Sequence, residues 1–206
     1  MNLKLPNSIP VFPLSGVIYF PKTNLPLNIF EQRYLDLVND VFKKDKFMGM
    51  IQSSRKKDDI FKVGCLGKIE EFKKSNDGRV FINLTGVTRF EIVEEIKSPK
   101  LYREFKVDYK KFTLDLNDFS QKVHFESLME KAKKFFTKSG LLINWMEFEK
   151  LNDTQKINTL AMIAPITNEE KQKLLESLSL QEKVAALESI IGFYLHEINF
   201  NNQTVQ

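Results

Sequence analysis

The sequence contains a single cysteine, Cys65, among 206 residues. A lone cysteine cannot form an intrachain disulfide, so a small fold stapled by disulfides is excluded. The two histidines, His124 and His196, lie in separate segments expected to be helical, with no second ligand at metal-binding spacing, and we expect no metal site. Cys65 lies in the apolar stretch KVGCLGKI, which favours a small buried side chain over a reactive thiol.

Long hydrophobic runs are also missing. Every apolar stretch is broken by Pro, Lys, Asn or Glu well before the roughly 18 residues that a membrane-spanning helix requires. Pro6 and Pro10 interrupt the N-terminal region in which a secretory signal would need a short apolar helix. We therefore expect no transmembrane helix, no leader peptide and a cytoplasmic protein.

Arginine is scarce, although the formal net charge is +4. The arginines are Arg33, Arg55, Arg79, Arg89 and Arg103, and the other basic residues are lysines. Proteins that read a nucleic acid sequence rely on the bidentate fork of arginine. The basic clusters at 43–46, 55–57, 73–74 and 131–134 have Asp or Glu nearby, which is typical of a solvated mixed-charge surface. The composition therefore disfavours nucleic acid as a partner.

The signatures of common enzyme sites are missing as well. The sequence has no G-x-x-x-x-G-K-[ST] phosphate loop, no G-x-S-x-G elbow, no G-x-G-x-x-G and no H-E-x-x-H. Glu70-Glu71 and Glu94-Glu95 are adjacent pairs in predicted strands, where neighbouring side chains point to opposite faces and cannot act on one bond. We predict no catalytic residue and no cofactor, and rank a hydrolase with an unrecognised site last.

The first half of the chain has the pattern of a β-rich fold. Strands are predicted at 47–51, in KVGCLGKIEEF, twice in RVFINLTGVTRFEIVEEI, and at 101–109, where apolar and polar residues alternate. The Asp77-Gly78 pair indicates a tight turn, and Gly64 and Gly67 indicate bends or close backbone approaches. One amphipathic helix is expected, because apolar residues recur at spacings of three and four between Phe30 and Phe42.

The second half has a helical pattern. An apolar repeat from Phe119 to Phe136 is stopped by Ser139-Gly140, and further helices are predicted at 142–151, from Asn152-Asp153 to Ala164, and at 180–198. Two S/T-x-x-E capping boxes, Thr167 with Glu170 and Ser179 with Glu182, are typical of helix starts. The polar end NFNNQTVQ is expected to fray.

Several motifs in order resemble a known family. PVFPL, FP, LPL and IFEQRY, then VGCLGKIEEF, DGR and LTGVTRFEIVEE, then the helices from LNDTQK to LESII, closely resemble the N-terminal substrate-recognition domain of the Lon ATP-dependent proteases. The resemblance implies an α+β fold with a β-rich, PUA-like pseudo-barrel at 1–115, an all-helical bundle at 116–200 and a polar tail at 201–206. The ATPase and Ser-Lys peptidase domains of the full proteases are not in these 206 residues, so we expect a stand-alone N-terminal domain.

The resemblance also identifies residues that we expect to be structural. They are Pro13, Pro21, Pro26, Phe30, Glu31, Arg33, Tyr34, Gly64, Gly67, Asp77, Gly78, Gly86 and Arg89. Pro10 and Pro13 would restrict the entry to a strand, and Pro21 and Pro26 would set turns. Glu31 and Arg33 lie two apart on the predicted helix and would not face each other, so each is expected to bond to the β part rather than to a peptide. Lys22 stands where the family often has glycine.

Two functions from different classes stay open. The resemblance implies a non-catalytic module that binds unfolded or apolar polypeptide segments, or that docks a client to a separate protease or chaperone, with a homodimer as a further prediction. The alternative is an RNA-binding module, because PUA-like folds elsewhere bind RNA and this chain is basic. A fold alone does not transfer a function, so RNA ranks second.

Overall fold

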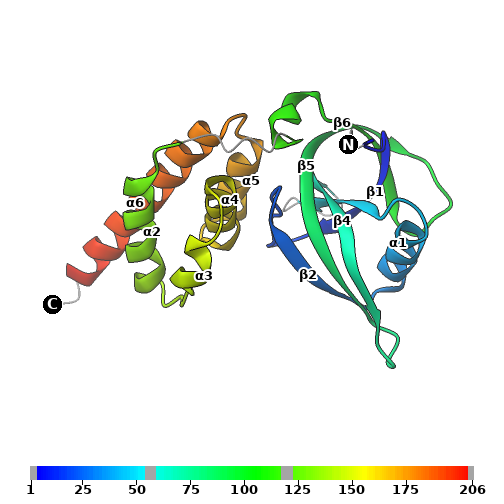
Figure 1. Cartoon of the computed structure of the whole chain (residues 1–206), viewed down its shortest axis with the longest axis horizontal. Helices are drawn as coiled ribbons and strands as arrows, with labels where there is room; N and C mark the ends of the chain where they lie inside the picture. Colours follow the sequence, from blue (N-terminus) through cyan, green and yellow to red (C-terminus); the bar gives the residue numbers. More distant parts are fainter. Residues whose placement is uncertain (1–3, 54–58, 117–122, 204–206) are drawn as a thin grey trace. The chain divides into compact units, whose positions relative to one another are not determined.

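The computed structural model describes residues 4–53, 59–116 and 123–203 (Figure 1). The chain divides into two compact units, Met1–Asn117 and Asp118–Gln206. The first unit is rich in strands and the second is helical, which confirms the predicted α+β class. The predictions for the basic cluster 55–57 and for Phe119 lie outside the described residues.

The first unit is built on one six-stranded sheet. Its strands are β1 (Ser8–Leu14), β2 (Asn24–Ile29), β3 (Phe47–Gln52), β4 (Val63–Lys74), β5 (Val80–Ile96) and β6 (Arg103–Asp108). The strand order is β2-β5-β4-β3-β1-β6, and β6 also pairs with β5. Five strands therefore close into a ring, and β2 lies outside it on the flank of β5 (Figure 1). Strands β1 and β3 are parallel, and the other pairs are antiparallel.

Strand β5 is a single strand of 17 residues, so the prediction of two strands in RVFINLTGVTRFEIVEEI is wrong. Gly86 lies in its middle without ending it. The strand continues because its first half pairs with β2, its second half pairs with β6, and β4 pairs with it from Lys74 to Val63. Backbone pairing along both edges of β5 outweighs the weak strand preference of one glycine.

The interior of the ring is filled by apolar side chains. They are Ile9, Val11, Phe47, Ile51, Leu66, Phe90, Phe105 and Val107. The Phe90 ring is fully buried, and a Cβ added at Gly64 would lie 2.6 Å from its Cζ atom and 2.5 Å from the carbonyl oxygen of Met50. Glycine at this position makes room for the ring, which explains the close approach predicted there. Cys65, the residue after Gly64, is buried, as predicted.

Helix α1 (Gln32–Phe42) packs on β1 and β3. Its buried face consists of Tyr34, Leu37, Val38 and Val41, which confirms the amphipathic pattern. The helix does not include Phe30, however. Glu31 is the extended N-cap residue, with φ −73° and ψ 131°, and the Phe30 side chain before it is 68% exposed.

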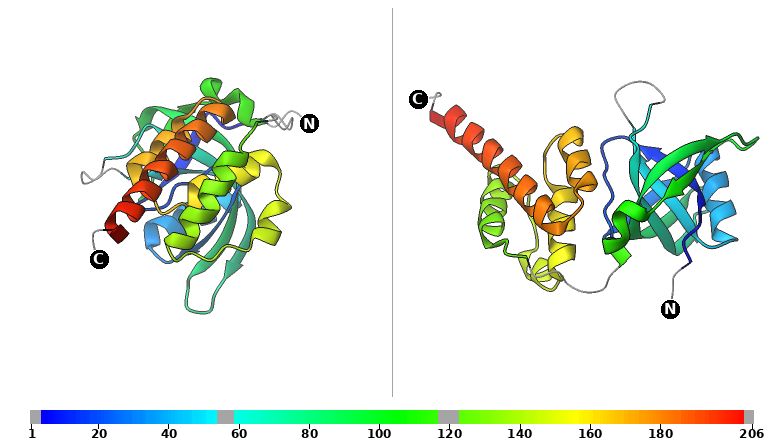
Figure 2. Two further views of the ribbon diagram at one scale, coloured as in Figure 1. Left: turned by 90° about the vertical axis from the view of Figure 1, so that its left-hand side faces the viewer. Right: turned by 90° about the horizontal axis from the view of Figure 1, so that it is seen from above.

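The described residues of the second unit, 123–203, form five α-helices. They are α2 (Glu126–Lys138), α3 (Trp145–Glu149), α4 (Asp153–Ile163), α5 (Asn168–Glu176) and α6 (Leu180–Gln203). Helix α6 lies beside α2 and also packs on α4 and α5 (Figure 2). The helix starts predicted at Asn152, Thr167 and Ser179 are confirmed: Asn152 and Thr167 each form a capping box, and the Ser179 hydroxyl accepts a bond from the Glu182 N–H.

Several helical boundaries differ from the predicted ones. The helix predicted at 142–151 is a short helix of five residues, because Asn144 caps its start and the chain turns again at Lys150. His124 precedes α2 in an exposed position and is not helical. Helix α6 continues to Gln203, so the frayed end predicted from residue 199 is wrong for the first residues of that tail.

None of the helices in the described ranges combines the length and the hydropathy that a bilayer-spanning segment needs. Within the same ranges, no group of three or more His, Cys, Asp or Glu side chains could hold a metal ion.

Candidate functional site

The residues singled out by the family resemblance do not gather in one place. Gly64 and Gly67 lie in β4, Gly86 and Arg89 in β5, Pro13 in β1 and Tyr34 in α1. Tyr34 packs edge-on against Phe12, with 4.0 Å between the ring centroids. These residues serve separate local geometries, and they do not form a binding site together.

Gly86 allows a turn to approach β5 closely. The Lys22 N–H donates to the Gly86 carbonyl oxygen at 2.8 Å, and the Gly86 N–H donates to the Thr23 carbonyl oxygen at 2.9 Å. A Cβ atom at Gly86 would lie 2.2 Å from the carbonyl oxygen of Phe20, so no larger residue fits. Pro21 is buried at the start of this turn, as predicted. Lys22 has φ +61°, the left-handed conformation that favours the glycine often found there in the family.

Pro26 does not set a turn, contrary to the prediction. It lies in the middle of β2, opposite Asn83 of β5. Proline is tolerated there because β2 is the last strand of the sheet, where a missing N–H breaks no ladder on the open side.

Glu31 and Arg33 pair with each other, so the prediction that they face apart is wrong. Because Glu31 is extended rather than helical, its carboxylate accepts bonds from Nε and Nη2 of Arg33 at 3.1 and 2.9 Å. The guanidinium also lies over the Tyr34 ring, 4.5 Å from its centroid. Both charged groups are about half exposed, and the bond to the β part expected for each is not found among the described contacts.

Arg89 forms a buried ion pair that the sequence did not reveal. Its Nε and Nη2 atoms donate to the Asp115 carboxylate at 2.9 and 2.8 Å, and its backbone N–H donates to the same group at 2.9 Å. Asp115 belongs to the 3-10 helix η1 (Lys110–Leu116), and Phe112 of η1 stacks under the guanidinium at 4.4 Å. This contact attaches η1 to β5.

The Asp77-Gly78 turn between β4 and β5 is confirmed. Gly78 has φ +86°, and its N–H donates to the carbonyl oxygen of Ser75 at 3.1 Å. The Asp77 carboxylate accepts a bond from the Arg79 N–H, which holds the pKa of this carboxyl below its usual range. The turn ends a hairpin that protrudes from the ring (Figure 1).

An open groove of about 730 Å³ lies on the outer face of strands β2, β5 and β4. We call it the outer groove, and its lining residues are Asn24, Pro26, Leu27, Asn28, Glu71, Lys73, Phe81, Ile82 and Asn83. The strand register explains its composition. Asn28, Phe81 and Lys73 are cross-strand neighbours, and Pro26, Asn83 and Glu71 form the next row. Ile82 and Leu84 point inward and are buried, so Phe81 and Asn83 must point outward.

The outer groove offers an aromatic ring and amide groups to a ligand. Phe81 is 47% exposed. Within the described part of the chain, the side-chain amides of Asn28 and Asn83 have no hydrogen-bond partner, whereas Asn24 accepts a bond from the Thr85 hydroxyl at 3.1 Å. The charged residues of the lining, Glu71 and Lys73, lie 3.9 Å from each other. The groove is therefore neutral, partly apolar and able to form hydrogen bonds.

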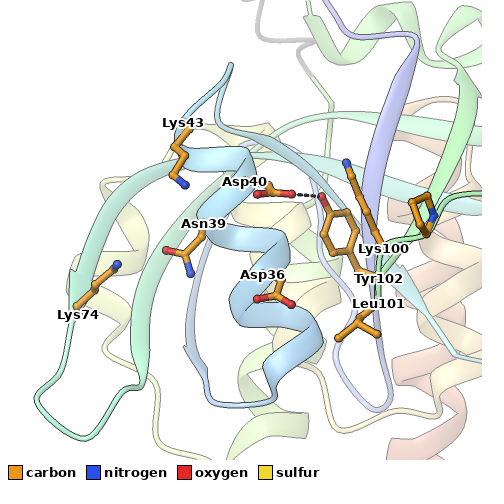
Figure 3. A pocket seen from close by; sticks show the side chains of 9 residues that line it. Asp36, Asn39, Asp40, Lys43, Lys74, Lys100, Leu101 and Tyr102 are labelled. Atoms are coloured by element: carbon orange, nitrogen blue, oxygen red, sulfur yellow. Dashed lines mark hydrogen bonds between the residues drawn. The ribbon is translucent and has the colours of Figure 1, made fainter.

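A second pocket, of about 550 Å³, lies between α1 and the segment before β6 (Figure 3). Asp36, Asn39 and Asp40 project into it from α1, and Lys100 and Tyr102 from the opposite side (Figure 3). Its polar groups largely bind residues of the same unit. The Tyr102 hydroxyl donates to Asp40 at 2.7 Å, and Lys100 donates to Glu104 at 2.9 Å.

Tyr102 of this second pocket is poorly suited to proton transfer. Burial raises the pKa of Tyr102 to about 12, and the hydrogen bond to Asp40 acts in the same direction. A phenol with such a pKa stays neutral near neutral pH, so it is a poor general base. The outer groove is the better candidate for ligand binding. The side-chain amides of Asn28 and Asn83 have no partner among the described residues, whereas Tyr102 and Lys100 of the second pocket already bind Asp40 and Glu104.

No feature of the sequence pointed to the outer groove. Phe81, Asn28 and Asn83 read as ordinary alternating strand positions, and they become neighbours only through the pairing of β2 with β5, which is distant in sequence.

Comparison with known proteins shows that the chain matches a protein family. The model of the ATP-dependent protease La (LON) substrate-binding domain matches residues 8–191. The Lon protease of Flavobacterium johnsoniae is 29% identical over 98% of this chain and 26% of its own length. The Lon protease of Syntrophus aciditrophicus is 24% identical over 97% of this chain and 27% of its own length. The chain thus spans about a quarter of the length of these relatives.

Two of the solved structures that match this chain illustrate the shared fold. The crystal structure of a Lon N-terminal domain protein from Xanthomonas campestris has a TM-score of 0.66 and 20% identity, covering 88% of this chain and 97% of that one. The N-terminal domain of the Mycobacterium avium complex Lon protease has a TM-score of 0.61 and 17% identity, covering 90% of this chain and 98% of that one. The predicted resemblance and the predicted fold are both confirmed.

Proposed function

Because the chain belongs to the LON substrate-binding domain family, we propose that it is a non-catalytic module that recognises substrate polypeptides through exposed segments of unfolded chain. Membership of a family of protease substrate-binding domains supports polypeptide recognition. The sequence has no recognised nucleophile-elbow, phosphate-loop or metal-ligand motif, which supports a role without catalysis.

The observation that carries this proposal is the outer groove. An unfolded polypeptide exposes apolar side chains and main-chain amides at the same time. The groove offers a half-exposed aromatic ring and two amide side chains without partners in the described part of the chain. Apolar contact removes water from the ring, and the amides can bond to a main chain regardless of its sequence.

The distribution of charge favours RNA binding less than polypeptide binding. Three lysines of the described basic clusters pair with acids, Lys73 with Glu71, Lys131 with Glu188, and Lys133 with Glu149, so part of the basic charge is already neutralised. An RNA-binding surface needs lysines and arginines whose charge is left for phosphates. Docking to a separate protease or chaperone, a homodimer and a cytoplasmic location all stay predictions.

The proposal is tested by fluorescence anisotropy with the whole chain. The probe is labelled α-lactalbumin, reduced and carboxymethylated so that it cannot fold, and the control is the same protein in its native calcium-bound form. We expect saturable binding of the unfolded probe and none of the native one, at low and at moderate salt. Equal binding of both forms, or binding of neither, would reject polypeptide recognition by exposed segments.

A further inference from the structure

We propose that the outer groove takes an extended, uncharged polypeptide segment, with one large apolar side chain packed on Phe81 and its main chain bonded to Asn28 and Asn83. This inference rests on the proposed function and specifies the class of segment. Three features of the groove carry it.

The first feature is the position of Phe81. Strand alternation places its ring on the outer face, and no aromatic or cationic side chain of the described residues stacks on it. Pro26 lines the groove from the neighbouring strand β2 on the same outer face, opposite Asn83, whereas Leu27 lies opposite the inward-pointing Ile82. An apolar side chain of a ligand would therefore find the rings of Phe81 and Pro26 on one face.

The second feature is the spacing of the amides. Asn28 lies directly across from Phe81 on β2, and Asn83 lies two residues further along β5 on the same face. Asn28 and Asn83 are thus diagonal neighbours across two strands, a spacing of about 7–8 Å, which is close to the two-residue repeat of about 7 Å in an extended ligand. Each amide carries a donor and an acceptor, so it can bind one peptide group of the ligand while the ligand side chain lies on Phe81.

The third feature is the charge of the lining. Glu71 and Lys73 pair with each other at 3.9 Å, and the other lining residues are uncharged. A segment of either charge would meet a like charge and would compete for an opposite charge that already has a partner. An uncharged segment is the electrostatic complement of this groove, and the same argument disfavours a nucleic acid backbone there.

The experiment compares short labelled peptides in which one central Phe is flanked by Ser, Thr and Asn. Matched peptides replace the Phe by Ala, or two flanking residues by Asp or by Lys. Binding to the whole chain is followed by anisotropy and by competition with the unfolded α-lactalbumin probe. We expect the neutral Phe peptide to bind tightest, with little dependence on salt. Tighter binding of the Asp or Lys peptides would overturn the charge argument.

Variants of the protein locate the contact. Phe81→Ala should weaken binding of the Phe peptide more than about tenfold, whereas Phe81→Leu should keep much of it. Val93→Ala is the matched control, because Val93 is also an exposed apolar residue of β5 but does not line the groove. The double change Asn28→Ala and Asn83→Ala should weaken both the Phe and the Ala peptides. Melting temperatures close to that of the unchanged protein establish that the variants fold.

The outcomes separate the two proposals. If the unfolded probe binds but Phe81→Ala and the asparagine variant bind it unchanged, the groove is not the site, and polypeptide recognition stands without it. If the unchanged protein binds neither the probe nor any peptide, both proposals fail.

Discussion

Replacing Asp115 by Ala should destabilise the β-rich unit strongly. Asp115 accepts three bonds from Arg89, whose side chain is only 4% exposed, and the carboxylate itself is 11% exposed. Removing one partner of a buried pair takes the Asp115 carboxylate away from a desolvated guanidinium, which costs about 3–5 kcal/mol. Arg89 keeps its other interactions, including the contact with the Phe112 ring, so we expect a loss near the lower end, about 3 kcal/mol.

The assay is urea denaturation followed by far-ultraviolet circular dichroism, together with thermal melting. A loss of about 3 kcal/mol should lower the melting temperature of the β-rich unit by about 10 °C. The urea midpoint should fall while the slope stays unchanged, because the surface exposed on unfolding is the same.

Two further variants make the test specific. Glu94→Ala removes an exposed ion pair with Lys106 between β5 and β6, and should change stability by less than about 1 kcal/mol. The double variant Arg89→Met with Asp115→Leu removes the pair without leaving a charge, and should recover much of the lost stability. If Asp115→Ala melts like the unchanged protein, the buried pair does not hold η1 on β5 and the reasoning fails.

Three other predictions follow from local geometry. Gly86→Ala should destabilise by about 2 kcal/mol or more in urea, because its Cβ would overlap the Phe20 carbonyl oxygen; an unchanged midpoint would contradict this. Lys22→Gly should raise stability by about 0.5–1 kcal/mol, since the cost of φ +61° disappears, and a lowered melting temperature would refute it. The bonds from Lys131 and Ser127 lower the pKa of Glu188, so its contribution is present above its unfolded pKa and is lost as the pH falls through the folded pKa. Melting of Glu188→Gln should therefore depend less on pH between about pH 5 and pH 3, and equal pH profiles would contradict this.

Much of the fold could be predicted because its local signals agree with its tertiary contacts. The apolar stripe of α1, the capping box at Thr167 and the Asp77-Gly78 turn depend on near neighbours in sequence, and all three are present. The motifs that resemble the family also indicated that a β-rich part precedes a helical bundle. Helix ends were less predictable, since one extended residue, Glu31, was enough to remove Phe30 from the helix.

The errors arise where distant pairing decides the outcome. Strand β5 passes through Gly86 because β4 pairs along one of its edges and β2 and β6 pair along the other, and no local pattern contains that information. Pro26 becomes a strand residue for the same reason. The Arg89 pair joins residues 26 positions apart, and the outer groove depends on the pairing of β2 with the distant strand β5, so composition and periodicity could not reveal them.

The position of Pro26 also bears on self-association. The bond from the Gly86 N–H to the Thr23 carbonyl sets the alternation of β2, so the backbone groups of Asn24, Pro26 and Asn28 point away from β5. The middle of this open sheet edge therefore lacks the N–H donor that an added strand would need. Open edges promote aggregation between copies, and a proline in the middle of one is a common protection against it. A domain proposed to hold unfolded chains could thus contact them on its outer face without nucleating a growing sheet.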